Sequence, residues 1–258
     1  MRAYNNDPAL KAAFLAELKW HQEQDMIIQG TYAKGSNGDF QGCAIGCSIH
    51  SLAKMRGEKL DTSNHQLLED LLGIPFQLAH MEDAVFESLP LGQAKQWPLR
   101  FAAAIPVGAD LSMVIPHFLY WTLTDDVKPT KYPQFQPFID AVVALYAEWT
   151  RTGARPSYRA DLADLAYRAD RADRADRADR AYLAYRAYLA YLAYRADRAY
   201  LADLAYRAYL AYRAYRADRA YRVDLADRAD RAYLARTVDK IIELLEAAPV
   251  PQDVDAAR

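Results

Sequence analysis

A triplet repeat runs from Arg159 to Arg236 and constrains the chain more than any other feature. Its middle position is Ala throughout, except at Val223. The first position is Arg or Leu, and the third is Asp or Tyr until Arg236 closes the series. The rule holds 26 times over 78 residues. Each allowed pair of residues differs by one nucleotide, which indicates that a short coding unit expanded and then acquired point changes.

The composition of this array favours an α-helix. Ala, Leu and Arg are strong helix formers, and the chain has neither Gly nor Pro between Ser157 and Ala248. Acidic side chains stand four residues before basic ones, as in Asp170 and Arg174, which adds about 0.2–0.5 kcal/mol a pair. We therefore predict a very long helix, roughly 130 Å if unbroken. A helix that breaks and packs on the rest of the chain, a disordered segment and a β-solenoid are the alternatives.

The three-residue period decides how such a helix presents its side chains. Three residues advance about 300° around a helix. Residues at the same position of successive triplets are therefore displaced by about 60° around the helix axis. No face stays apolar, and a regular coiled coil, which needs a period of 3.5 residues, is disfavoured.

The charge of the chain is divided unevenly. The array holds 17 Arg and 12 Asp, a net charge of +5, whereas the remainder holds 15 Lys and Arg against 22 Asp and Glu, a net charge of -7. Interleaved Asp opposes phosphate binding, so nucleic acid is not an expected partner. Two stretches, 182–194 and 200–215, are rich in Tyr and Leu. We expect them to mediate self-association or binding to a protein partner.

Residues 1–155 are expected to form a separate, compact all-α head. Helices are predicted from apolar periodicity, capping residues and Gly or Pro stops. No convincing alternation typical of strands is present. The predicted organisation is a helical head over 1–155, the repeat helix over 157–248 and a disordered tail over 249–258. The expected helices of the head begin at Asp7-Pro8 and then cover about 43–55, 67–72, 75–90, 92–105, a segment carrying His117 and Trp121, and 135–150.

Several classes of protein are excluded or disfavoured by composition. No run of 18 apolar residues is present, so a membrane-spanning helix is not expected. The first residues lack a signal-peptide pattern, and two cysteines cannot build a disulfide framework. A cytoplasmic location is therefore predicted. Phosphate-loop, dinucleotide-binding, HExxH and GxSxG motifs are absent, and no cofactor is predicted.

The densest polar group in the head is Cys43, Cys47 and His50, which a helix would place on one face. Cys43 and Cys47 could be buried thiols at a tight helix contact beside two glycines. Cys43 could instead be a nucleophile, with its pKa lowered at a helix N-terminus, Gln41 near an oxyanion and a histidine as base. The three residues could also hold a metal with a further histidine, although their spacing is not a standard zinc pattern. The candidate bases are His50, His65, His80 and His117, and the candidate fourth ligands are His65 and His80.

Three acidic pairs are interpreted as solvated helix faces or caps rather than as acid–base catalysts. They are Glu69-Asp70, Glu82-Asp83 with Glu87, and Asp125-Asp126.

Short motifs over about residues 20–125 are similar to those of a family of uncharacterised bacterial, phage and metagenomic proteins. The resemblance implies a bacterial or phage origin, a helical head and an Ala-rich tail of low complexity. It implies no activity and no catalytic residue. The matching motifs are GCAIGC at 42–47, LGIP at 72–75, EDAVFE at 82–87, LP at 89–90, Trp97, Arg100-Phe101 and AIPVG at 104–108.

Together these patterns predict a non-enzymatic interaction or scaffold protein with a long helical tail. The alternative is a thiol enzyme in the head that uses Cys43 with a histidine base, for which His50 is the first candidate.

Overall fold

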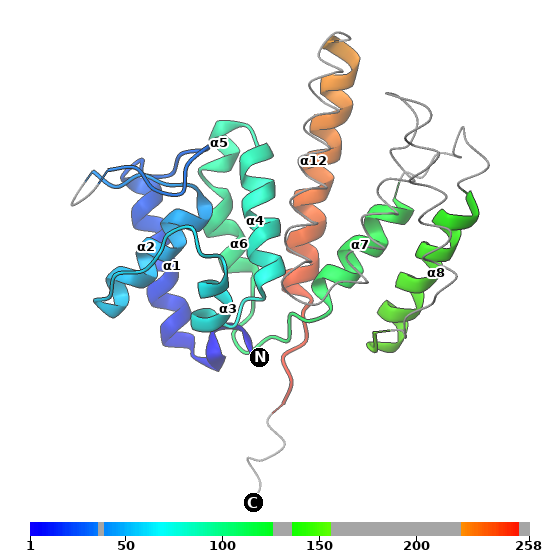
Figure 1. Cartoon of the computed structure of the whole chain (residues 1–258), viewed down its shortest axis with the longest axis horizontal. Helices are drawn as coiled ribbons and strands as arrows, with labels where there is room; N and C mark the ends of the chain where they lie inside the picture. The colour runs from blue at the N-terminus through cyan, green and yellow to red at the C-terminus, as the bar shows by residue number, and fades with distance from the viewer. Residues whose placement is uncertain (36–38, 126–135, 156–222, 253–258) are drawn as a thin grey trace, which may run out of the picture. The chain divides into compact units, whose positions relative to one another are not determined.

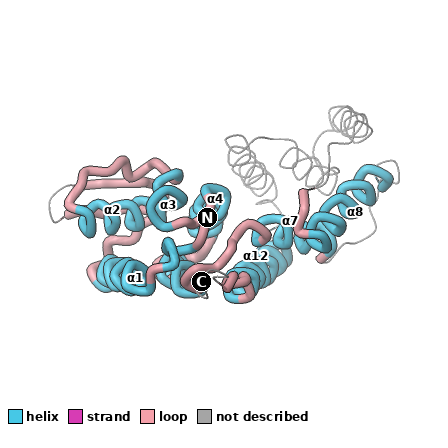
Figure 2. The backbone as a smooth tube through the Cα atoms, turned by 90° about the horizontal axis from the view of Figure 1, so that it is seen from below, coloured by secondary structure: helices cyan, strands magenta, loops and turns pink. Residues whose placement is uncertain are grey.

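A computed structural model of the chain describes residues 1–35, 39–125, 136–155 and 223–252. This part of the chain is helical and contains no strands (Figures 1 and 2), which confirms the predicted helical fold class for the described residues. A 3₁₀ turn, η1, spans Ala3–Asn6. The α-helices are α1 Pro8–Glu23, α2 Ala44–Arg56, α3 Gln66–Leu72, α4 Phe76–Ser88, α5 Leu91–Ala94, α6 Trp97–Ala104, α7 Val114–Thr124, α8 Gln136–Thr152 and α12 Val223–Glu246.

The helix ends follow local chemistry that the sequence displays. Asp7 caps α1 by accepting a hydrogen bond from the Ala9 amide at 2.8 Å. α2 and α3 end at Gly57 and Gly73, both in the left-handed conformation that glycine adopts without strain.

The helix predicted over 92–105 is divided into α5 and α6. Pro98 stands in the first turn of α6. A continuous helix would need an amide hydrogen at Pro98 to bond the Ala94 carbonyl, and proline has none. The prediction of one helix was therefore wrong at this proline.

The chain divides into two compact units, of which the first comprises Met1–Val114 and Arg219–Arg258 and the second Ile115–Asp218. In the first unit α2 contacts α1, α4 and α6, and α6 also contacts α1, α4, α5 and α12. Trp97, Phe86 and Tyr4 are among its largest fully buried side chains. The Tyr4 hydroxyl donates to the Ala102 carbonyl at 2.6 Å, so η1 is fixed to α6. In the second unit the described helices are α7 and α8.

α12 joins the end of the triplet array to the first unit. Its residues 223–236 are the last of the array, and the helix continues into 237–246, where the triplet rule stops. That continuation buries Val238, Ile241, Ile242 and Leu245, an i, i+3, i+4, i+7 stripe typical of a packed helix. α12 contacts α6.

The segment after α12 also lies on the first unit. The Asp110 amide donates to the Pro249 carbonyl at 2.8 Å, and Arg2 Nη1 donates to the Pro251 carbonyl at 3.0 Å. Residues 253–258 of the predicted disordered tail and residues 157–222 of the predicted repeat helix lie outside the described residues. None of the described helices is long and apolar enough to cross a membrane.

Candidate functional site

Cys43 is the N-cap residue of α2, at the helix start that the sequence predicts. The loop before it runs across this helix end: the Cys43 amide donates to the Thr31 carbonyl at 2.7 Å, and the Gly42 amide donates to the Met26 carbonyl at 3.0 Å. A Cβ atom at Gly46 would collide with the backbone of Tyr32. Glycine in the first turn of α2 is therefore what lets the loop lie against the helix.

Both thiols are free and buried, with Cys43 2% exposed and Cys47 0% exposed. Cys47 Sγ donates to the Gly42 carbonyl at 3.4 Å, and burial raises the pKa of this thiol to about 12. Burial, and then the charge of Asp83, raise the pKa of Cys43 far above its ordinary value, despite the Gly46 amide that points at Sγ. Desolvation thus outweighs the helix N-terminus, and both groups are thiols at neutral pH.

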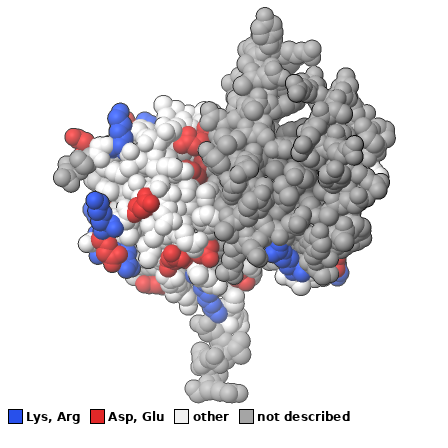
Figure 3. Space-filling model, viewed as in Figure 1, with Lys and Arg blue, Asp and Glu red and all other residues white. Residues whose placement is uncertain are grey.

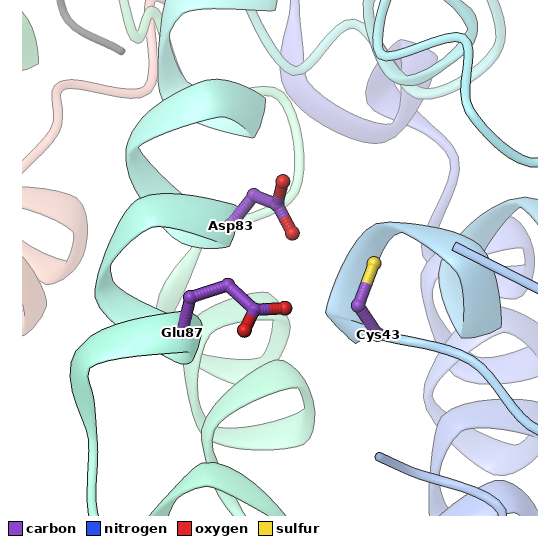
Figure 4. Close-up of side chains that lie close together, drawn as sticks. All are labelled: Cys43, Asp83 and Glu87. Atoms are coloured by element: carbon purple, nitrogen blue, oxygen red, sulfur yellow. The ribbon is translucent and has the colours of Figure 1, made fainter. Parts of the chain in front are cut away.

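Cys43 faces two carboxyl groups from α4 (Figure 4). One donor atom from each of Cys43, Asp83 and Glu87 lies within 4.8 Å of the others. Asp83 and Glu87 are four residues apart, so one face of α4 presents both to the start of α2. Within the described ranges this is the one group of three or more His, Cys, Asp or Glu side chains with donor atoms so close together.

Neighbouring groups hold both carboxyl side chains. His65 Nε2 lies 3.2 Å from Asp83 Oδ2, and His65 Nδ1 lies 3.2 Å from the Ser63 carbonyl. The His65 ring stacks on His80 with 3.8 Å between centroids. The Gly30 amide donates to both oxygens of Glu87, at 3.0 and 3.1 Å.

His50 belongs to a different cluster. Its Nδ1 lies 2.8 Å from Nε2 of the fully buried His21, and its ring stacks on Phe40 with 3.9 Å between centroids. His21 Nδ1 lies 2.9 Å from the Glu17 carbonyl, which can only accept, so Nδ1 carries the hydrogen. His21 Nε2 then accepts from His50. Burial lowers the pKa of both imidazoles.

The remaining candidates from the sequence are also accounted for. The Gln41 side-chain amide donates to the Asp25 carbonyl at 3.4 Å. His117 lies on α7, in the second unit. His65 and His80 are beside the Cys43 cluster, where His65 contacts Asp83 and not a thiol.

The sequence interpretation missed the carboxyl partners of Cys43. It assigned Glu82, Asp83 and Glu87 to a solvated face, whereas Glu82 is 2% exposed and Asp83 Oδ1 is buried. α4 contacts α2, α3 and α6, so little of its surface is left for water. The i, i+4 spacing of Asp83 and Glu87 was the available signal, but nothing local links either residue to Cys43.

Comparison with known proteins adds no relative: no protein family, curated protein or solved structure matches the chain. The family resemblance stays a prediction.

On the face shown in Figure 3, charged side chains of the first unit stand among uncharged surface, and blue and red groups are interspersed. On this face the described residues form no extended block of Lys and Arg.

Proposed function

We propose that the chain is a non-enzymatic interaction protein, in which the head anchors the triplet array and the array binds protein. The burial and protonation of the two thiols are the observation that supports the non-enzymatic part of this proposal. Cys43 and Cys47 are buried with raised pKa values, and the histidine nearest in sequence, His50, is engaged with His21. A thiol nucleophile needs a thiolate and a base within hydrogen-bond reach.

The alternative, a thiol enzyme built on Cys43, has less support from this geometry. The groups around Cys43 Sγ are carboxylates, and a carboxylate beside a thiol opposes thiolate formation. His65 is separated from Cys43 by the Asp83 carboxyl group, to which it is bound.

The array is the part of the chain that we assign to binding. We propose that 157–248 is one long helix, and α12 supports this for the last part of the array. The packed residues of α12 attach the C-terminal end of the array to the first unit, while α8 precedes its start. Along the chain, the array therefore stands between α8 and the packed end of α12.

The most economical partner is a second copy of the same array. Arg and Asp recur at a fixed spacing of three residues, with 17 Arg and 12 Asp in all. A surface that carries both signs at one spacing is complementary in charge to its own copy. Tyr and Leu add apolar area without requiring a specific partner pocket. The two free thiols fit a reducing compartment such as the cytosol.

Alkylation of the thiols tests the non-enzymatic half of this proposal. The folded chain is treated with iodoacetamide at pH 7, and labelling of each cysteine is followed by mass spectrometry, with the urea-unfolded chain as reference. We expect both thiols to react at least about tenfold more slowly when folded, because each pKa unit above the ordinary value removes about nine-tenths of the thiolate.

Fast and selective labelling of Cys43 in the folded chain would contradict the proposal and favour the thiol enzyme. A Cys47→Ala variant is the matched control, since it leaves Cys43 as the one cysteine and assigns the rate to a single thiol.

A further inference from the structure

Three groups that commonly ligate metals meet where the start of α2 faces α4. We infer that Cys43, Asp83 and Glu87 bind one divalent ion of the zinc class, with the fourth coordination position open to water or to a further ligand. This is a different set from Cys43, Cys47 and His50, which the spacing of the sequence suggested. It is independent of the function proposed for the array.

The donor set and its spacing suit such an ion. The three donor atoms lie within 4.8 Å of one another. Ligands of a tetrahedral zinc ion stand about 3.3–3.7 Å apart, given its bond lengths to sulfur and oxygen. On binding, the donor atoms would have to move closer together by no more than about 1.5 Å. A thiolate among the ligands favours a borderline-soft ion over Mg²⁺ or Ca²⁺, which prefer oxygen ligands alone.

Each donor is contacted from outside the cluster by a nitrogen atom of a backbone amide or an imidazole. The Gly46 amide points at Cys43 Sγ at 3.4 Å, His65 Nε2 contacts Asp83 Oδ2 at 3.2 Å, and the Gly30 amide contacts both Glu87 oxygens. Such contacts orient the side chains that coordinate the metal directly, and losing one of them commonly lowers metal affinity about 10–100-fold. The loop, α2 and α4 therefore fix the three donors before any ion arrives.

A separate observation concerns the hydrogen bonding of Asp83. Asp83 Oδ1 is buried without a hydrogen bond of ordinary geometry, and the donor that the Asp83 carboxyl group meets on α2 is the Cys43 thiol, whose hydrogen bond helps to raise the thiol pKa. The side chains of Asp83 and Cys43 point toward each other across the space between the two helices (Figure 4), and Cys43 is 2% exposed. A thiol is a weak donor, so a cation that replaces the thiol proton between Cys43 and Asp83 would satisfy this buried carboxylate more fully.

Binding would join α2 to α4 through the ion. The Cys43 S–H bond breaks as the sulfur–metal bond forms, and the proton leaves to solvent. Asp83 and Glu87 each supply an oxygen lone pair, and no group is oxidised or reduced. With one ligand on α2 and two on α4, the ion would resist separation of these helices, and it would stabilise the folded chain by mass action.

Titration with Co²⁺, a spectroscopic substitute for Zn²⁺, tests the site on the full chain without an affinity tag. We expect one Co²⁺ per chain and a near-ultraviolet absorption band from thiolate-to-cobalt charge transfer. We also expect Zn²⁺ to displace the cobalt and raise the Tm. Cys43→Ala should abolish the band. Cys47→Ala, which removes the other buried thiol one helical turn later, should keep it.

Two further variants keep the test decisive if Cys43→Ala fails to fold. Glu87→Gln and Asp83→Asn preserve size and, judged by far-ultraviolet circular dichroism, should remain folded, yet each should weaken Co²⁺ binding at least about tenfold. Absence of a thiolate band in the unaltered chain would overturn the inference. A band that persists in folded Cys43→Ala, or an affinity unchanged in Glu87→Gln, would overturn it as well.

Discussion

At the residue scale, a pair of histidines that should respond to pH, His21 and His50, links α1 to α2. His21 Nδ1 donates to the Glu17 carbonyl and its Nε2 accepts from His50. Ser51, which lies 3.3 Å from His21 Nδ1, donates its own hydrogen to the Cys47 carbonyl. The hydrogen bond is lost when both imidazoles are protonated, because two N–H groups then face each other.

This arrangement predicts a loss of stability in mild acid. Burial lowers the pKa of both imidazoles in the folded chain, and Lys54 lowers that of His50 further. The unfolded chain binds protons first, near pH 6.5. The free energy of unfolding should thus be fullest above pH 6.5 and should fall as the pH drops toward the lowered folded-state values. Urea unfolding between pH 7.5 and 5 measures this.

The control for that prediction is His50→Gln, which removes one imidazole of the pair. Glu82 contributes with the opposite sign, because burial raises its pKa and folding then favours its protonated form as the pH falls. The quantity to compare is therefore the pH slope of His50→Gln against that of the unaltered chain. If His50→Gln leaves the pH slope unchanged, the histidine pair is not the cause of the loss of stability in acid, and the prediction is contradicted.

Gly46 gives a second prediction at this scale. Gly46→Ala should lower the free energy of unfolding by about 1–3 kcal/mol or more, because the added methyl group meets the Tyr32 backbone. Gly92→Ala is the matched control: it lies in α5 with no atom within 4 Å of a built Cβ. Alanine there should stabilise the helix by about 0.5–1 kcal/mol. Equal effects in urea unfolding would contradict the close approach at Gly46.

At the element scale, α12 attaches the end of the array to the first unit. Its first 14 residues are the end of the triplet array, whereas its last residues carry an apolar stripe with helical period. The apolar positions of the array rotate around the helix, so they offer no constant face to pack. The change of period after Arg236 is what turns the helix into one that can pack against α6.

This contrast predicts that the attachment depends on apolar burial. Ile241→Ala, at a fully buried position, should cost about 2–5 kcal/mol of unfolding free energy. The neighbouring exposed change Glu243→Ala should cost much less. The exposed ion pair between Arg100 and Asp239, 3.1 Å apart, should contribute no more than about 1 kcal/mol. Urea unfolding followed by circular dichroism measures both variants, and Asp239→Ala measures the contribution of the ion pair in the same way.

The elements of the head were largely predictable because their signals are local. Pro75 precedes α4, Gly57 and Gly73 end α2 and α3, and Asp7 caps α1. The Cys43 cluster was not predictable in the same way. Cys43 and Asp83 are separated by 40 positions, and their approach depends on how α2 packs on α4, which no local pattern encodes. The buried state of Glu82 has the same origin.

At the scale of the whole molecule, an acidic remainder of net charge -7 carries a repeat of net charge +5. In sequence, the array follows α8 and ends within α12, and α12 belongs to the same unit as the N-terminal residues. The binding role that we propose for the array rests on its Tyr and Leu stretches and on its two interleaved charges. If the array binds a second copy of itself, the average molecular mass in solution should rise with protein concentration.

Sedimentation equilibrium over a range of concentrations tests it most directly. We predict that the full chain associates reversibly. Replacing five tyrosines by Ala, which keeps helix propensity, should shift it toward the monomer, and replacing them by Phe should preserve association. A full chain that stays monomeric throughout, or an association that the Ala variant leaves unchanged, would contradict the claim. The tyrosines to replace are Tyr182, Tyr185, Tyr188, Tyr191 and Tyr194.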